Sequence, residues 1–191
     1  MLKLPINIKN VEFFDKGKRS LIYTGTYKNS KVAIKVKNPT SKAINRIENE
    51  AKYLKILNKY KIGPKLIKSN KKCIIYEFIE GKQYIEIIKA NNKTKVKQIS
   101  KKILNKCRQI DKLKINKLEF IRPTKHIFIK NNKVKIIDFE RCYKTDKPKN
   151  VTQFCQFLLN NKILPKSSIK IIKEYKNNQT EKNFKKILNE I

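Results

Sequence analysis

The sequence contains no apolar run close to the roughly 20 residues needed to cross a bilayer, so we expect no membrane-spanning helix. The N-terminal segment Met1–Asn7 also lacks the long apolar stretch of a secretory signal peptide. We therefore expect a cytoplasmic protein whose four cysteines are reduced thiols. The cysteines form no C-x-x-C pair and there is one histidine, His126, so no structural metal site is expected.

Acidic residues are scarce as well. There are 15 Asp and Glu against 48 Lys and Arg, which gives a formal net charge of +33, and only five of the cations are arginines. A protein with so large a positive charge attracts polyanions. Sequence-specific readers of nucleic acid favour Arg and interleaved aromatic residues, and neither is concentrated here. Two interpretations stay open: a compositional by-product of a Lys-, Ile- and Asn-rich chain, or a surface that contacts RNA or a ribosome.

The order of the predicted elements indicates an α+β fold. The first part is expected to be β-rich with one helix, between Pro39-Thr40-Ser41 and Gly63-Pro64, and the rest mainly helical with one small hairpin around Asn131-Asn132. The strands are expected at 11–14, 21–27, 31–37, 73–79, 127–129 and 134–137, and the later helices at 84–88, at 96–113, after Asn150, after Pro165 and from Thr180 to the end. The 191 residues suffice for one domain with two lobes, about 1–81 and 82–191.

Three charged residues, Lys35, Glu50 and Asp138, are candidates for a binding or catalytic site. In Val32-Ala-Ile-Lys35, alternation places Val32 and Ile34 on one strand face and Lys35 on the other. The alternative is a half-buried strand with lysines on its solvent side.

Glu50 falls on the apolar stripe of the following helix, where a carboxylate needs a charged partner. The alternatives are that Glu48 holds this place, or that Glu50 is an edge carboxylate. Asp138 ends the apolar strand Val134–Ile137, where a carboxylate could bind Mg²⁺; a lone Asp there is otherwise a turn residue.

The order Lys35, Glu50, Asp138-Phe-Glu140 resembles the protein-kinase superfamily, specifically its atypical RIO-like members and the small archaeal proteins described as predicted serine/threonine kinases. The resemblance covers roughly Phe13 to Leu159. It implies a two-lobed kinase-like fold without an activation segment, with ATP and Mg²⁺ as cofactors. Arg122–His126 and Asn150–Gln153 also look like signatures of the archaeal group.

The resemblance implies roles for several residues. Lys35 would contact the nucleotide phosphates, Glu50 would hold Lys35, and Asp138 would bind Mg²⁺. Ala33 would leave room for adenine, and the backbone of Glu77, Phe78 and Ile79 would hydrogen-bond it. Gly17 and Ser20 would form what is left of the glycine-rich loop, in which only the middle glycine is present.

The catalytic loop departs from the family pattern. Asn116–Arg122 stands where His-Arg-Asp is expected, and Glu119 is the one carboxylate available there as a general base. A solvated loop carboxylate is the alternative for Glu119. Lys125 or Arg122 could steady the transferred charge, and His126, near the slot of a second metal ligand, is expected to be structural or phosphate-facing.

Three functions follow from these residues. The first is an ATP–Mg²⁺-dependent protein serine/threonine kinase with an unidentified protein acceptor. The second is a pseudokinase or ATPase-type nucleotide-binding module on an RNA or ribosomal particle. A small-molecule kinase is the third, and the short second lobe disfavours it because it leaves little room for a dedicated substrate pocket.

Overall fold

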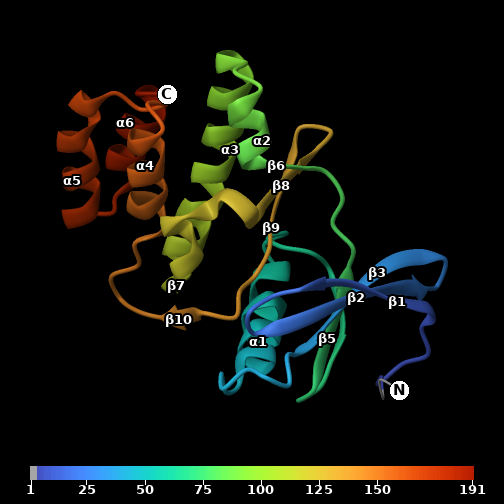
Figure 1. Ribbon diagram of the computed structural model, residues 1–191. Coiled ribbons are helices and arrows are strands. Elements are labelled where there is room, and N and C mark those ends of the chain that lie inside the picture. The colour runs from blue at the N-terminus through green and yellow to red at the C-terminus, as the bar shows by residue number, and fades with distance from the viewer. Residues whose placement is uncertain (1–3) are drawn as a thin grey trace. The chain divides into compact units, whose positions relative to one another are not determined.

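The structure, a computed structural model, describes residues 4–191, so Met1–Lys3, the beginning of the N-terminal segment discussed above, lies outside the described residues. The chain is α+β and divides into two compact units (Figure 1). The first unit contains the chain up to Glu80 together with Lys135–Cys142, and the second contains Gly81–Val134 and Tyr143–Ile191. Over residues 4–191, no helix has both the length and the apolar character that a membrane crossing requires.

The first unit is built on a five-stranded antiparallel sheet with the order β1-β2-β3-β5-β4. Its strands are β1 (Lys9–Lys16), β2 (Ser20–Tyr27), β3 (Ser30–Lys37), β4 (Leu66–Ser69) and β5 (Cys73–Glu77). The two-residue turn between β2 and β3 has positive φ at both Lys28 and Asn29, 46° and 60°. Turns of this hand match the twist of a hairpin, so the predicted turn position is confirmed. The short strand β4 was not predicted.

One face of this sheet carries an apolar core. Val32, Ile34 and Val36 of β3 pack with Cys73 and Ile75 of β5, as the alternation of β3 predicted. The other face of β3 carries Ala33 and Lys35, both buried. Helix α1 (Arg46–Asn58) contacts β3, β4 and β5, and Figure 1 shows it beside the sheet.

Both predicted ends of α1 were wrong. The polar residues near Thr40 close local turns instead of capping the helix, since the Ser41 hydroxyl accepts a hydrogen bond from the amide of Ala43 at 3.2 Å. At the other end, the amide of Ile62 donates to the carbonyl of Leu57 at 3.1 Å, and Lys61 has a φ of 57°. This is a Schellman-type ending in which Lys61 takes the left-handed position usually held by glycine.

The second unit is mainly helical (Figure 1). Its helices are α2 (Tyr84–Lys89), α3 (Lys93–Lys112), α4 (Asn150–Asn160), α5 (Ile169–Asn177) and α6 (Glu181–Asn189), with 3-10 turns η1 (Leu118–Ile121), η2 (Pro123–Lys125) and η3 (Lys166–Ser168). The predicted helices are all present. The remaining strands are β6 (Lys82–Gln83), β7 (Ile115–Lys117), β8 (Ile127–Lys130), β9 (Lys133–Ile136) and β10 (Cys142–Lys144). The predicted Asn131-Asn132 turn joins β8 and β9, with φ of 48° and 60°.

A buried polar network holds the second unit together. The Asp111 carboxylate on α3 accepts hydrogen bonds from the main chain and side chain of Asn150 at 3.0 and 2.7 Å, from the amide of Val151 at 3.3 Å and from the Tyr175 hydroxyl at 3.0 Å. These four donors satisfy both carboxylate oxygens. Asn150, part of the sequence signature noted above, therefore fixes the start of α4 against α3.

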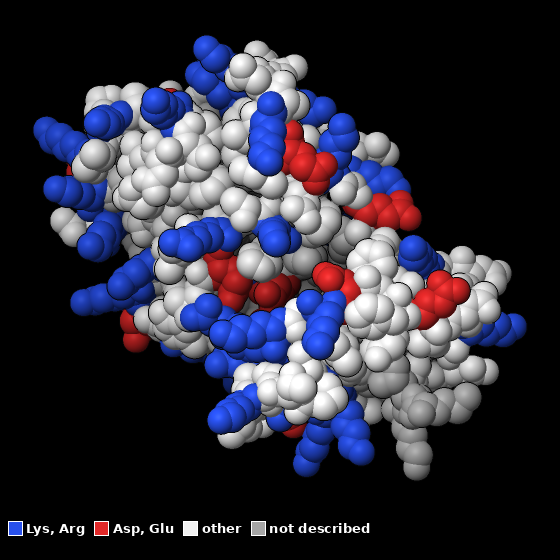
Figure 2. Space-filling view, viewed as in Figure 1, with Lys and Arg blue, Asp and Glu red and all other residues white. Residues whose placement is uncertain are grey.

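On the face seen in Figure 2, the positive charge is dispersed. Lys and Arg side chains are scattered over the visible face in Figure 2 and do not gather in a single patch. This distribution agrees with the even spread of lysines along the sequence.

Gly63 offers a test of the packing in the first unit. Its φ is +81°, and an added Cβ would lie 2.7 Å from Leu54 Cδ1 and 2.9 Å from the Phe139 ring. We expect Gly63→Ala to lower the free energy of unfolding by about 2–4 kcal/mol, because strained backbone and overpacking add. The exposed control Lys59→Ala should change it by less than about 0.5 kcal/mol. Urea denaturation measures both; equal midpoints would refute the packing described here.

Candidate functional site

Lys35 is a buried cation on the central strand β3. Its side chain is 7% exposed, and its strand neighbours in register are Ile22 and Ile74. The solvent-side lysine considered as an alternative is therefore wrong. A buried ammonium is costly unless charged partners surround it, so the partners of Lys35 define the site.

The first partner is Glu50, which projects from the buried stripe of α1. Lys35 Nζ donates to Glu50 Oε2 at 2.6 Å, and the Glu50 side chain is 3% exposed. The other carboxylate oxygen of Glu50 accepts a hydrogen bond from the amide of Phe139 at 3.3 Å. The ion pair expected from the sequence is present, and both oxygens of Glu50 are engaged.

Two further carboxylates follow β9. Lys35 Nζ lies 3.2 Å from Asp138 Oδ1 and 3.3 Å from Glu140 Oε2. Asp138 has a φ of 65°, a left-handed conformation that is uncommon outside glycine but that Asp tolerates. Between them Phe139 is fully buried and contacts the position of Gly63. The bend at Asp138 thus brings two carboxylates to one ammonium while the aromatic ring anchors the segment.

Arg19 joins the cluster from the loop between β1 and β2. Its Nη1 lies 3.2 Å from Glu140 Oε1. The loop itself is closed by a hydrogen bond from the amide of Gly17 to the carbonyl of Ser20 at 2.8 Å, and the Asn38 amide group donates to the carbonyl of Gly17 at 3.3 Å. Glu140 therefore links the glycine-containing loop to Lys35.

Helix α1 also fixes the main chain that carries the carboxylates. Asn49 Nδ2 donates to the carbonyls of Glu140 and Cys142, each at 2.9 Å, and Arg46 donates to the Glu140 carbonyl at 3.3 Å. These bonds cross about 90 residues of sequence. These hydrogen bonds fix the position of residues 138–142 relative to α1.

Burial and charge shift the pKa values of the cluster in definite directions. Burial alone would lower the pKa of Lys35, but the attraction of Glu50 and Asp138, with smaller contributions from Tyr76 and Glu140, raises it well above its usual value. Burial raises the pKa of Glu50, and the charge of Lys35 opposes that rise. Lys35 accordingly carries its positive charge throughout the physiological pH range.

The cluster could hold a divalent cation. Carboxylate oxygens of Glu50, Asp138 and Glu140 lie within 4.8 Å of one another, and hard oxygen ligands suit Mg²⁺. Asp138 is the best placed of the three because its side chain is 24% exposed, whereas those of Glu50 and Glu140 are 3% and 5% exposed.

The residues expected around adenine are placed less favourably. Ala33 is buried opposite Tyr76 in the sheet. The amides of Glu77 and Phe78 already donate to the carbonyls of Lys65 and Lys31, at 2.9 and 3.2 Å. These two amides are not open to adenine, which corrects that part of the expectation.

The amide of Ile79 and the ring of Phe78 are better placed to contact a ligand. Within residues 4–191, Ile79 makes no hydrogen bond, so its amide remains for a ligand. The Phe78 ring meets that of Phe14 edge-on, with centroids 5.3 Å apart, and lies 4.3 Å from the ammonium of Lys31.

Glu119, the predicted general base, belongs to the second unit. Its side chain is 6% exposed and its Oε2 lies 3.0 Å from the ammonium of Lys117, which is itself 1% exposed. The alternative of a solvated loop carboxylate is therefore wrong. Arg122 and Lys125 are exposed next to the 3-10 turns, and His126 is half-buried.

Sequence reasoning missed three charged residues: Glu140, Arg19 and Lys117. Glu140 was quoted only as part of a motif, although a charged residue directly after a buried Phe is a signal that it needs a partner. Arg19 is one of only five arginines in the chain, and this rarity could have indicated it. Lys117 carried no signal, since lysines are spread along the whole chain.

The buried ion pair makes a stability prediction. Glu50→Ala should lower the free energy of unfolding by about 3 kcal/mol, because it removes the closest partner of a buried ammonium. Glu48→Ala, a half-buried residue of the same helix, should change it by less than about 0.5 kcal/mol. Chemical denaturation compares the two variants, and equal losses would contradict the assignment of Glu50 as the principal partner.

Comparison with known proteins does not place the chain in a family. No protein-family model matches it, and no curated protein is significantly similar to it. Its function must therefore be argued from the geometry of the site.

Proposed function

We propose that this protein is an ATP–Mg²⁺-dependent phosphotransferase with a kinase-like two-lobed fold, acting on serine or threonine of an unidentified protein. One observation carries the proposal: Lys35 of β3, Glu50 of α1 and Asp138 after β9 meet at a single ammonium, at 2.6 and 3.2 Å. These residues are 15 and 88 positions apart along the sequence, yet they converge in the arrangement that phosphoryl transfer uses.

Each residue of the cluster has a distinct task in this proposal. Lys35 binds the α- and β-phosphates while Glu50 keeps its ammonium in place. Asp138, the most exposed of the three carboxylates, holds Mg²⁺, and the metal would supply charge neutralisation at the phosphates. Gly17 and Ser20 lie in the loop over the phosphates, with Ala33 and Ile79 on the adenine side.

The acceptor side of the reaction is assigned to the second unit. Glu119 is a buried carboxylate whose Oε2 lies 3.0 Å from the ammonium of Lys117, and it takes the role of general base toward the acceptor hydroxyl. Arg122 and Lys125, exposed nearby in sequence, contribute positive charge for the transferred phosphoryl group.

A second function is favoured by a specific observation, the position of Glu140. Its two carboxylate oxygens lie 3.2 Å from Arg19 and 3.3 Å from Lys35, so it occupies cations that would otherwise contact phosphates. This arrangement favours a module that binds a nucleotide at the same cluster without turning it over. The +33 charge would hold such a module on an RNA or ribosomal particle.

Nucleotide binding is the first prediction of the proposed function. Mg-ATP should raise the thermal midpoint, by a stabilisation of about 2.7 kcal/mol when free ligand is about 100 times Kd. Chelation of the metal with EDTA should remove the shift, because the nucleotide phosphates would then face the three carboxylates of the cluster without a neutralising cation. Lys35→Ala should abolish the shift, whereas Lys37→Ala, on the same strand but exposed, should keep it. No shift in the wild type at millimolar Mg-ATP would refute the proposal.

Turnover is the second prediction. Asp138→Ala should remove detectable ATP hydrolysis or autophosphorylation, because the metal ligand is lost. Glu119→Gln should lower the rate by roughly 10²-fold, as expected for a general base. Radiolabelled ATP measures both. A Glu119→Gln rate equal to wild type would show that the base assignment is wrong, and a wild type as inert as Asp138→Ala while both bind ATP would establish the binding-module function.

A further inference from the structure

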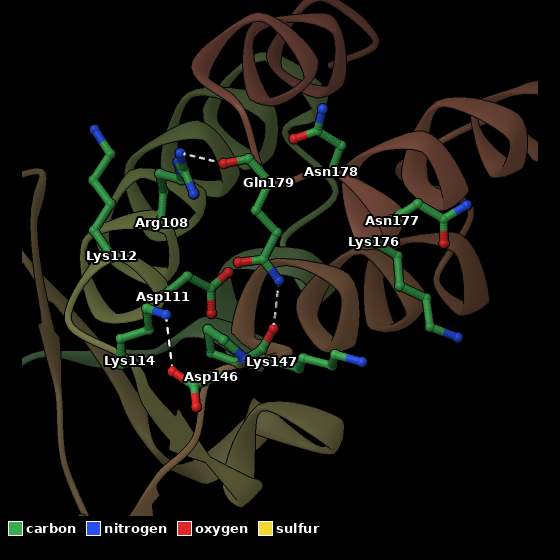
Figure 3. Close-up of a pocket in the computed structure, with 11 residues that line it drawn as sticks. Arg108, Asp111, Lys112, Lys114, Asp146, Lys147, Lys176, Asn177, Asn178 and Gln179 are labelled. Atoms are coloured by element: carbon green, nitrogen blue, oxygen red, sulfur yellow. Dashed lines mark hydrogen bonds and ion pairs between the residues drawn. The ribbon is translucent and has the colours of Figure 1, made fainter.

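A cavity of about 710 Å³ lies entirely within the second unit. Figure 3 shows its walls, which come from the C-terminal end of α3 and the residues after it, from the segment before α4, and from the connection between α5 and α6. It shares no residue with the Lys35 cluster. The proposed function assigns no role to it.

The cavity is lined by an excess of cations. Five line it: Arg108, Lys112, Lys114, Lys147 and Lys176. The opposing lining carboxylates are Asp111 and Asp146. Asp111 is 2% exposed and its two oxygens are satisfied by the four hydrogen bonds described above, so it serves the fold.

The other lining cations are only loosely neutralised. Lys114 pairs with Asp146 at 2.9 Å, and Lys112 pairs with Glu181, outside the cavity wall, at 2.9 Å. Both pairs are solvent-exposed, with side chains 53–94% exposed, and such pairs contribute little. Lys147 and Lys176 have no side-chain hydrogen bond or ion pair within residues 4–191. A bound anion would therefore meet available charge.

Arg108 gives the cavity a rigid element. Its side chain is 10% exposed; Nη1 donates to the Tyr175 hydroxyl at 3.1 Å and Nη2 to the Gln179 carbonyl at 2.7 Å. The guanidinium also lies 5.4 and 5.9 Å from the rings of Tyr175 and Phe184. Its Nε is buried without a hydrogen bond, with Glu181 at 3.6 Å. The guanidinium is thus fixed in place at the cavity wall, where it shares its charge with Glu181.

The remaining lining groups indicate what kind of anion fits. No aromatic side chain lines the cavity, whereas Asn177, Asn178 and Gln179 supply amides. Bases are recognised by stacking on aromatic rings, so this lining suits phosphates and sugar hydroxyls. The volume lies within the range of small-molecule sites and accommodates several phosphate groups.

We propose that this cavity binds a run of adjacent phosphate groups. Arg108 provides the fixed guanidinium, and Lys147 and Lys176 provide mobile ammonium groups at the rim. Two sources share this chemistry, a free polyphosphate and the backbone of an RNA chain. Because the site is independent of Lys35, it would work equally in an active kinase or in a nucleotide-binding module.

The test compares two variants of equal charge. Lys147→Gln/Lys176→Gln removes two cations from the cavity, and Lys97→Gln/Lys101→Gln removes two exposed lysines from α3 elsewhere. Both pairs are exposed, so neither variant should unfold, which circular dichroism melting checks. Tripolyphosphate is titrated calorimetrically at 150 mM salt into both variants, and because Lys35 is unchanged in both, any binding at the nucleotide site contributes equally to the two titrations. The cavity variant should bind at least about tenfold more weakly, and the control should change by less than about twofold.

A single-stranded uridine 12-mer, titrated in the same way, distinguishes the two sources. If the cavity variant loses affinity for tripolyphosphate alone, the cavity binds a free polyphosphate. If it also loses affinity for the 12-mer more than the control variant does, the cavity binds an RNA backbone. Equal losses in the two variants for both ligands, or no loss in the cavity variant, would overturn the proposal.

Discussion

The buried ammonium of Lys35 is the interaction on which the first unit depends. It lies on the central strand of the sheet, and its charge requires carboxylates that the strand itself does not supply. Glu50 brings α1 to it, while Asp138 and Glu140 bring the segment after β9. Removing the charge would take away the cation that three neighbouring carboxylates share. The same contacts that hold these elements together therefore also assemble a site with oxygen ligands and a fixed cation.

The sequence predicts the parts of this arrangement that depend on residues close together in the chain better than the parts that depend on distant residues. Periodicity and turn residues predicted the strands around Lys28-Asn29 and Asn131-Asn132 because both features are local. The ends of α1 were wrong because Ser41 closes a local turn and Lys61 takes a left-handed position that sequence patterns reserve for glycine. The short strands β4, β6, β7 and β10 carry too few residues for any periodic signal.

In the candidate site, too, some contacts could be expected from the sequence and others depend on the folded backbone. The position of Glu50 on the buried stripe of α1 indicated that it needs a partner, and the resemblance to kinases named Lys35 as that partner. The role of Glu140 required the positive φ of Asp138, which turns the chain back toward Lys35, and no sequence pattern specifies that bend. Likewise, the buried state of Glu119 depends on Lys117, whose neighbours come from distant parts of the chain. The amides of Glu77 and Phe78 pair with the carbonyls of Lys65 and Lys31, and no local sequence pattern specifies that pairing.

The most direct test of the central claim is a crystal structure of the protein with Mg²⁺ and a non-hydrolysable ATP analogue. The account predicts Lys35 Nζ at hydrogen-bonding distance from an α- or β-phosphate oxygen, still paired with Glu50, with Asp138 coordinating Mg²⁺ at about 2.1 Å. Glu140 should then have released Lys35, since the phosphates take its place. A nucleotide bound elsewhere, with Lys35 still held by Asp138 and Glu140 as at present, would contradict the account.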